Sequence, residues 1–429
     1  MVETFIAAEL FESPAAEPML MERICEWRNM DRALNRVVRN KGRPGPDGMT
    51  VAQLVKHVRR FGDQIRAELI ADRYTASPVL RVHIPKANGG KRPLGIPTVL
   101  DRLVQQMVVQ VLLPYWEPTF SEFSFGFRLK QSQHDAIRCA RKFIGHGKEQ
   151  CVVLDLKQFF DLVNQDRLMS RLATRIPDKR VLRLIRGFLQ SGVLHGGVVS
   201  PTMKGVPQGG PLSPLLSNIV LDELDKELER RGLDFVRYAD DILIFVNSRK
   251  AGERVLSSVS RYLQRKLKLQ VNESKSGVHL PWRITHLGFS FSRVGGIVKL
   301  RVSRKALDRF RERVRELTAR SQGRSLKHVI YKLNQYLRGW CGYYGHADQK
   351  SAIQKLQCWI RRRLRSLVWK HWKTRRHRVL ELLRRGVHKH WARIVGCSRK
   401  GPWPMSGHGT VRQALPNALF DRLGLFQMV

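Results

Sequence analysis

Two adjacent acids set between two β-favouring runs constrain the fold of this chain more than any other feature. Asp240 and Asp241 follow the run FVRY at 235–238 and precede the apolar run ILIFV at 242–246. This pattern predicts a strand, a tight turn and a second strand. Because Asp tolerates turns, the pair could be only the polar tip of a hairpin. Adjacent carboxylates repel unless a cation neutralises them, however, and carboxylate oxygens suit Mg²⁺. A metal site would need at least one more acid from elsewhere in the chain.

A candidate third acid ends another apolar run. Asp155 closes the run CVVLD at 151–155, which predicts a buried strand. A carboxylate at such a place costs free energy unless a cation or hydrogen bonds compensate for its burial. Asp155 is therefore the candidate third ligand. We interpret Asp161, six residues later, as the N-cap of a helix that begins near Val163.

A basic hairpin turn is the first candidate for nucleotide contact. Residues 79–84 alternate as a strand does, and Asn-Gly-Gly at 88–90 predicts a hairpin turn with Lys86, Lys91 and Arg92 at its shoulders. Flexible glycine backbone beside several cations suits a triphosphate. A solvated basic turn would give the same pattern.

A second turn, rich in Gly and Pro, spans residues 205–214 and contains Gln208. It leads into a predicted helix, and free backbone N–H groups at a helix start suit contact with a nucleotide or a template. An ordinary connection between two elements would explain the turn as well.

The charge of the chain points to a polyanionic partner. The formal net charge is +42 and the isoelectric point is about 11.0, so self-repulsion disfavours the compact state unless a polyanion such as nucleic acid is bound. Residues 301–400 hold 29 Lys and Arg against 5 Asp and Glu. Six of the nine tryptophans lie between 340 and 403. This region is predicted to be helical over about 303–320, 325–345 and 350–395, and to bind a phosphate backbone.

Other compartments are disfavoured by the sequence. No apolar stretch approaches the roughly 18 residues that a membrane-spanning helix needs. The first 21 residues carry four glutamates and no Lys or Arg, which is the wrong charge for a signal or transit peptide. The six cysteines include no C-x-x-C pair, which favours reduced thiols in a cytoplasmic protein.

Taken together, these motifs identify a family. The chain resembles bacterial group II intron-encoded reverse transcriptases, also called maturases, over roughly residues 35–400. The matching motifs, which are specific in combination, are the loop 41–50, IPK at 84–86 with KRPLGIP at 91–97, FSFGFR at 123–128, Asp155 with FFD at 159–161, PQGGPLSP at 207–214, YADD at 238–241, Lys275, LGF at 287–289 and GWCGYY at 339–344.

The resemblance implies an α+β fold, namely a right-hand polymerase with fingers and a ferredoxin-like palm, followed by a helical, basic thumb/maturase domain. We accordingly expect an N-terminal extension over residues 1–75 and fingers and palm over 76–300. The RNA-binding thumb/maturase domain is expected over 301–395 and a short tail over 396–429. After residues 401–402 this tail is expected to be loosely folded, with an apolar end that can dock back. Many relatives end in an H-N-H endonuclease domain with paired cysteines. This sequence has no such pairs, so we expect no H-N-H endonuclease.

The resemblance also implies roles for individual residues. Asp155, Asp240 and Asp241 would be the catalytic acids and would hold two Mg²⁺ ions, with Mn²⁺ as a substitute. The residues implied to contact the deoxynucleoside triphosphate are Lys86, Arg92, Phe160, Gln208 and Lys275, and those implied to form a primer grip are Leu287, Gly288 and Phe289. Phe160 would exclude a ribose 2′-hydroxyl, although core packing explains it equally well. Lys275 would protonate the pyrophosphate leaving group, although a solvent-facing structural role is as compatible with the sequence.

The implied function is that of an RNA-directed DNA polymerase, a nucleotidyltransferase that copies RNA into DNA and assists the splicing and mobility of a group II intron. Its partners would be an RNA template, the intron RNA, a DNA primer or target and deoxynucleoside triphosphates, with no membrane. It would act in the bacterial cytoplasm, at the nucleoid when bound to DNA. Two alternatives stay open: an intron-free, domesticated reverse transcriptase of DNA repair or defence, and an RNA-binding splicing cofactor whose polymerase activity is dispensable.

Overall fold

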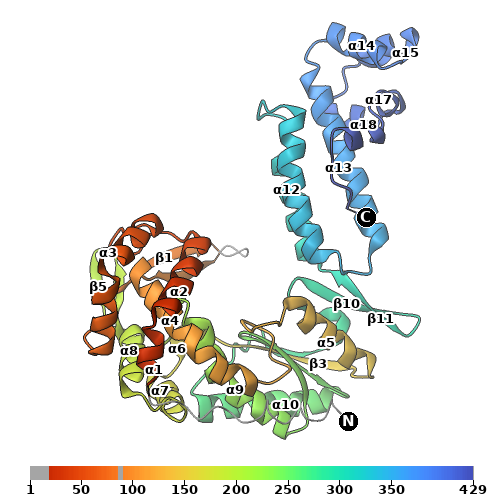
Figure 1. The fold of residues 1–429 in the computed structure, drawn as a ribbon. Coiled ribbons are helices and arrows are strands. Elements are labelled where there is room, and N and C mark those ends of the chain that lie inside the picture. The colour runs from red at the N-terminus through yellow and green to blue at the C-terminus, as the bar shows by residue number, and fades with distance from the viewer. Residues whose placement is uncertain (1–18, 86–89, 429) are drawn as a thin grey trace, which may run out of the picture. The chain divides into compact units, whose positions relative to one another are not determined.

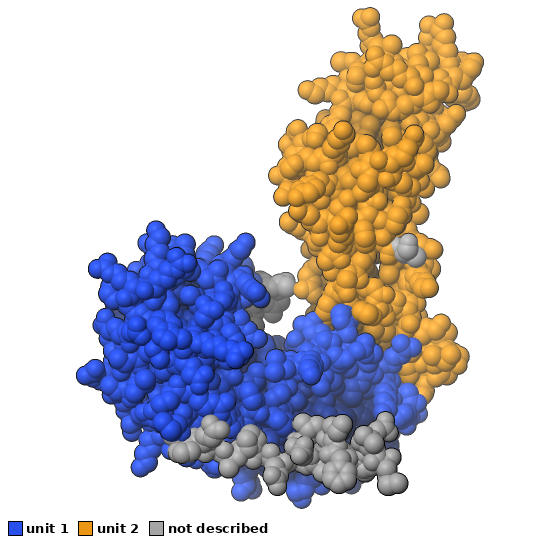
Figure 2. All heavy atoms as spheres, viewed as in Figure 1, with its two compact units in different colours: residues 1–280 blue, residues 281–429 orange. Residues whose placement is uncertain are grey.

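The computed structural model describes residues 19–85 and 90–428. The chain divides into two compact units, Met1–Leu280 and Pro281–Val429, which Figure 2 distinguishes by colour. The sequence placed the boundary between palm and thumb at residues 300 and 301. That domain boundary stays a prediction, while the compact units divide earlier because the strands at 285–302 belong with the helices that follow them.

Unit 1 combines many helices with two sheets. Its helices are α1 (Leu20–Ile24), α2 (Trp27–Asn40), α3 (Val51–Ile70), α4 (Val99–Trp116), α5 (Gln133–Gly145), α6 (Phe159–Leu162), α7 (Gln165–Ala173), α8 (Lys179–Gln190), α9 (Ser213–Arg230) and α10 (Arg249–Tyr262), with short turns η1 (Glu117–Thr119) and η2 (Leu263–Leu267). Its strands are β1 (Val79–Pro85), β2 (Lys91–Ile96), β3 (Gln150–Asp155), β4 (Val193–His195), β5 (Val198–Ser200), β6 (Asp234–Tyr238), β7 (Asp241–Val246) and β8 (Gly277–His279).

The second sheet of unit 1 has the expected ferredoxin-like arrangement. Its four strands lie in the order β6-β7-β3-β8, and every neighbouring pair is antiparallel. Figure 1 labels β3, α9 and α10 of this region. Along the chain, four helices and the strands β4 and β5 of the other sheet separate β3 from β6, a tight turn joins β6 to β7, and α10 separates β7 from β8. This is the β-α-β-β-α-β pattern. The expected α+β fold with a ferredoxin-like palm is thereby confirmed.

Helices cover both faces of this sheet. Phe245 of β7 contacts Phe143 of α5, with ring centroids 5.5 Å apart. The next residue, Val246, faces Gly252 of α10 on the opposite face, because successive side chains of a strand alternate. Asp241 is four residues before Phe245 in β7 and therefore points to the same face of the sheet. The α5 face therefore carries the acid that follows the turn.

The first sheet has the order β2-β1-β4-β5, in which β1 and β2 form the predicted antiparallel hairpin and β1 and β4 run parallel. Helix α3 precedes this sheet in the chain, and α4 directly follows β2. Both begin at a threonine cap: the hydroxyls of Thr50 and Thr98 accept hydrogen bonds from the N–H groups of Gln53 and Asp101. One continuous core of buried side chains joins these helices to the ferredoxin-like sheet.

Unit 2 is a small sheet followed by helices. After the turn η3 (Pro281–Arg283), the strands β9 (Thr285–His286), β10 (Phe289–Val294) and β11 (Ile297–Val302) form a sheet of order β11-β10-β9. The helices are α11 (Arg304–Leu317), α12 (Leu326–Tyr344), α13 (Lys350–His371), α14 (Arg375–Arg384), α15 (Lys389–Gly396), α16 (Pro402–Ser406), α17 (Gly409–Ala414) and α18 (Asn417–Arg422). Aromatic rings join α11 to α12: the centroid of Phe310 lies 4.6 Å from that of Trp340.

Two expectations about this unit were wrong. The single helical stretch predicted at 350–395 is three helices, because Thr374 caps α14 and Gly386 adopts a φ of +77° before α15. The tail after residues 401–402 is not loosely folded. It forms α16 to α18, and its last segment returns to α12, where Asn334 donates to the carbonyl of Gly424 and accepts from the N–H of Phe426.

No helix within residues 19–85 and 90–428 is long and apolar enough to cross a membrane.

The packing of the tail can be tested at Phe420, which is fully buried in α18 beneath the guanidinium of Arg365. Truncation in Phe420→Ala leaves a cavity, and we expect it to lower the free energy of unfolding of unit 2 by about 3–5 kcal/mol. Tryptophan fluorescence during denaturant unfolding reports this unit, since seven of the nine tryptophans lie in it. The exposed neighbour Arg422 provides the control Arg422→Ala, with an expected change within about 0.5 kcal/mol. Equal stability of the two variants would mean that α18 does not pack in solution.

Candidate active site

The predicted acid hairpin is the β6–β7 turn. Tyr238 and Asp241 form the last cross-strand pair, so Ala239 and Asp240 make up the two-residue connection. Ala239 has a φ of +56°, which is the left-handed region that alanine rarely adopts. The sequence therefore folds here into a strained turn with Asp240 at its tip and Asp241 at the first position of β7.

Strand register brings the predicted third acid to this turn. Asp155, the last residue of β3, lies directly opposite Asp241 of β7. Residues directly opposite in an antiparallel pair have Cβ atoms about 4.5–5.5 Å apart and point to the same face. The structure thus places Asp155 and Asp241 together, with Asp240 adjacent in the chain.

The loop that precedes β8 holds Asp155 in place. The Oδ2 atom of Asp155 accepts hydrogen bonds from Nδ2 of Asn272 at 3.0 Å and from Nζ of Lys275 at 3.1 Å. The backbone N–H of Asn272 donates to the carbonyl of Asp155, and the N–H of Asp155 donates to Oγ of Ser276. Lys275 is therefore an ion-pair partner of a candidate metal ligand. Sequence reasoning missed Asn272, although its place three residues before Lys275 was a usable signal.

Charge at this site is only partly balanced. Loss of hydration raises the pKa of Asp241 to about 6, and the negative charges of Asp240 and Asp155 add to the rise, whereas Lys275 opposes it. Within residues 19–85 and 90–428, no three His, Cys, Asp or Glu side chains are gathered closely enough to hold a metal ion. The donor set nevertheless suits a hard divalent cation, since all its ligands are carboxylate oxygens and a second positive charge would relieve the repulsion that raises the pKa of Asp241.

A cavity of about 320 Å³ collects two of the predicted nucleotide-binding residues. Phe160 and Gln208 both line it, and so do two cations that the sequence analysis missed, Arg81 and Lys204. Lys204 directly precedes the turn at 205–214, and that position was the available signal. Phe160 is 8% exposed, so it contributes to the core as well as to the cavity wall.

Asp161 also lines this cavity, and its predicted role as a helix cap is wrong. It already lies within α6, whereas Asn164 has the extended backbone of a cap and accepts a hydrogen bond from the N–H of Arg167.

Two of the predicted cations are not placed by the structure. Lys86 lies outside the described residues. The backbone of Arg92 pairs with Ile84 across the β1–β2 hairpin, and its side chain falls outside the part of the chain that is described. Their contact with a triphosphate stays a prediction.

The predicted primer grip lies in unit 2 and is braced by α12. Leu287 and Gly288 both have positive φ, and the carbonyl of Leu287 accepts a hydrogen bond from the hydroxyl of Tyr343 at 2.8 Å. A Cβ at Gly288 would come within 2.5 Å of the Tyr344 hydroxyl, so only glycine fits. Phe289 is fully buried against Tyr343 and Tyr344.

Comparison with known proteins decides the family. Residues 84–291 match the family described as "Reverse transcriptase (RNA-dependent DNA polymerase)", and residues 307–391 match "Group II intron, maturase-specific domain". Protein YkfC of Escherichia coli K12 is 31% identical over 328 residues, which cover 68% of this chain and 84% of that protein. The chain belongs to the group II intron reverse transcriptase/maturase family.

Two further relatives of this chain are named as intron-encoded or intron proteins. LtrA of Lactococcus lactis, named a group II intron-encoded protein, is 40% identical over 165 residues, which cover 38% of this chain and 27% of LtrA. The putative COX1/OXI3 intron 2 protein of Saccharomyces cerevisiae is 26% identical over 376 residues, which cover 72% of this chain and 43% of that protein. The chain thus spans less than half the length of these two relatives. Its family domains are those of nucleotidyltransferases that use divalent metal ions and bind nucleic acid.

The role of Phe160, which lines the cavity, can be tested by measuring the preference of the protein for deoxynucleotides over ribonucleotides. Truncation in Phe160→Ala enlarges the cavity, and we expect the ratio of kcat/KM for ribonucleotides to kcat/KM for deoxynucleotides to rise roughly tenfold or more. The matched control is Phe159→Leu, because Phe159 packs against Phe160 but does not line the cavity. Unchanged selectivity in Phe160→Ala would leave only the core-packing role for this ring.

Proposed function

We propose that this protein is an RNA-directed DNA polymerase that uses Asp155, Asp240 and Asp241 as its catalytic acids. The observation that carries the proposal is the register of β3 and β7, which sets Asp155 opposite Asp241 next to the turn that bears Asp240. These acids lie within the part of the chain that matches the reverse transcriptase family.

The three acids would hold two Mg²⁺ ions, for which Mn²⁺ can substitute. When bound, such ions lower the pKa of the attacking 3′-hydroxyl and stabilise the attacking and leaving oxygens. Asn272 and Lys275 orient Asp155, each through a hydrogen bond to its Oδ2 atom. The ammonium of Lys275, which is more than half exposed, also stands where it can donate a proton to the pyrophosphate leaving group.

The 320 Å³ cavity is the proposed place of the incoming deoxynucleotide. Phe160 would exclude the ribose 2′-hydroxyl, and Gln208 would contact the nucleotide from a turn that is tied to β2 by the hydrogen bond from the N–H of Gly95 to its carbonyl. Arg81 and Lys204, together with Lys86 and Arg92, would bind the triphosphate and offset the charge that develops on it.

Unit 2 supports a second function, assistance in RNA splicing. The match to the maturase-specific domain covers residues 307–391, and the helices there carry exposed cations such as Arg309, Arg313 and Arg315 of α11. Such a surface binds phosphate backbones and releases counterions. We infer that it contacts the RNA template and a group II intron RNA, and that the protein assists splicing and mobility of that intron.

The domain division that we propose follows from the two matches. Fingers and palm occupy residues 76–300 and the thumb/maturase domain 301–395, which enclose the matched ranges 84–291 and 307–391, with an extension at 1–75 and a folded tail at 396–429. We place the protein in the bacterial cytoplasm, at the nucleoid when it binds DNA. All six cysteines are free thiols, as expected of a reducing compartment.

Primer extension on an RNA template tests the proposed polymerase. The variant Asp240→Ala removes one acid from the turn, and we expect synthesis to fall below detection while the affinity for RNA stays within about twofold, because the basic surface is untouched. The control is Asp234→Ala, at the other end of the same hairpin, where the carboxylate pairs with Lys148. Substantial residual synthesis by Asp240→Ala would rule out the assignment of Asp240.

A further inference from the structure

A buried cation, the guanidinium of Arg237, donates a hydrogen bond to the backbone of the turn that carries the acids. Ala239 keeps its left-handed conformation while its carbonyl accepts a hydrogen bond from Nη1 of Arg237 at 3.1 Å. Arg237 is two residues earlier, on β6, and its side chain is fully buried. A strained residue persists only where its surroundings determine its conformation, so the partners of Arg237 matter to the turn.

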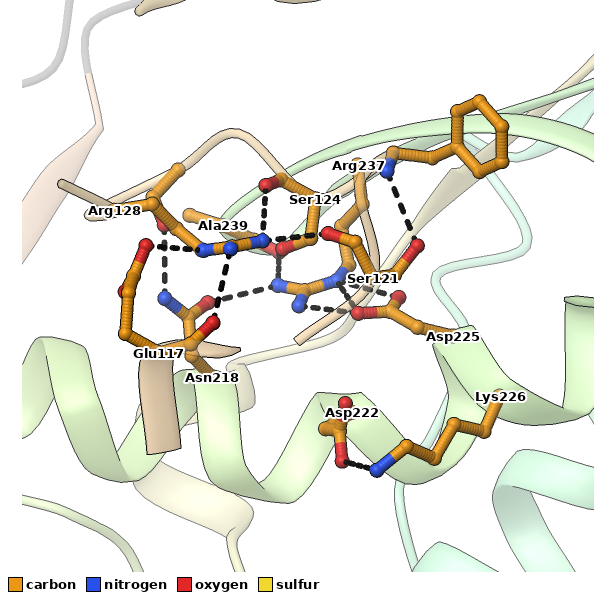
Figure 3. Close-up of polar contacts among 12 residues, drawn as sticks. Glu117, Ser121, Ser124, Arg128, Asn218, Asp222, Asp225, Lys226, Arg237 and Ala239 are labelled. Atoms are coloured by element: carbon orange, nitrogen blue, oxygen red, sulfur yellow. Dashed lines mark hydrogen bonds and ion pairs between the residues drawn. The ribbon is translucent and has the colours of Figure 1, made fainter. Parts of the chain in front are cut away.

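Helix α9 supplies those partners. Asp225, which is also fully buried, accepts from Nε of Arg237 at 2.7 Å and from Nη2 at 2.6 Å. Asn218 accepts from Nη1 at 3.0 Å. The two residues are seven positions apart and therefore share one face of the helix. Asp225 and Asn218 thus fix the guanidinium from α9, and its Nη1 atom also donates to the carbonyl of Ala239 (Figure 3).

A second segment packs against the same turn. The Nδ2 atom of Asn218 donates to the carbonyl of Gly126 at 2.9 Å, and a Cβ at Gly126 would lie 2.3 Å from the backbone nitrogen of Ala239. The N–H of Arg237 donates to the carbonyl of Phe123, and the N–H of Phe125 donates to the carbonyl of Arg237. Asn218 therefore connects the guanidinium to the backbone that lies against Ala239.

Such a pair is weak evidence for stability alone, because desolvation of two charges offsets their attraction. A buried fork of hydrogen-bond donors does, however, fix geometry. We propose that Arg237, fixed by Asp225 and Asn218, is a positioning residue that sets the place of Asp240 and Asp241 through the carbonyl of Ala239. This inference rests on the proposed polymerase function and adds to it the device that holds its catalytic turn.

The test replaces both charges together. In Arg237→Met/Asp225→Leu the buried pair becomes apolar, which commonly preserves or raises stability. We expect an unfolding midpoint at or above that of the wild-type protein, a KM for the deoxynucleotide within about threefold, and a kcat lower by roughly 100-fold, as misplaced catalytic groups produce. A purely structural role predicts wild-type kcat once the fold is retained, and that result would overturn the proposal.

The matched control removes a neighbouring ion pair from the same helix. Asp222 and Lys226 pair at 2.6 Å one turn from Asp225, and no hydrogen bond of either residue in the described chain reaches the turn (Figure 3). In Asp222→Leu/Lys226→Met we expect kcat within about threefold of wild type. A loss as large as that of the first double variant would overturn the proposal, since it would show that any charge removed from α9 acts alike.

A single variant keeps the proposal testable if the first double variant does not fold. Arg237→Lys retains a charge for Asp225, but one ammonium cannot reproduce the fork that reaches Asp225, Asn218 and Ala239 together. We expect a folded protein whose kcat falls at least tenfold with little change in KM. Wild-type kcat in this variant would overturn the positioning role alone, whereas absence of primer extension by the wild-type protein would overturn the proposed function itself.

Discussion

Repulsion among three carboxylates is the constraint on which the β6–β7 end of unit 1 depends. The register of β3 and β7 sets Asp155 opposite Asp241, and the tight turn adds Asp240. Acids this close require compensating positive charge. Lys275 supplies part of it at Asp155. The charges of Asp240 and Asp155 add to the rise in the pKa of Asp241 that loss of hydration causes. A divalent cation would complete the compensating charge, and reverse transcriptase domains use such ions.

Side chains alternate between the two faces of strands β6 and β7, so that Asp241 and the buried Arg237 lie on opposite faces. Asp241 and Phe245 point to the α5 side, where the site is open, whereas Arg237 lies opposite Ile242 and points to the α9 side. One face therefore carries the acids and the other carries the buried Arg237–Asp225 pair, whose guanidinium also donates to the carbonyl of Ala239 in the turn. Because both faces belong to the same two strands, a shift in the register would displace the acids and their support together.

Local patterns were sufficient to predict part of this structure. The β6–β7 hairpin and the strand that ends in Asp155 follow from the periodicity of their own residues. Arg237 was not recognisable, because its partners lie 12 and 19 residues earlier on α9 and meet it only after the sheet has formed. The break of the 350–395 stretch depended on Thr374 and Gly386, whose effect competes with a continuous helical pattern.

Replacement of Asp155 by cysteine tests directly whether this residue is a metal ligand of a polymerase site. Thiolates bind soft or borderline ions better than Mg²⁺. For Asp155→Cys we expect no primer extension with Mg²⁺ and a recovery of primer extension with Mn²⁺ or Cd²⁺. The control Asp234→Cys is expected to extend the primer with Mg²⁺ alone. Full activity of Asp155→Cys with Mg²⁺, or no recovery with either thiophilic ion in a folded protein, would contradict the account.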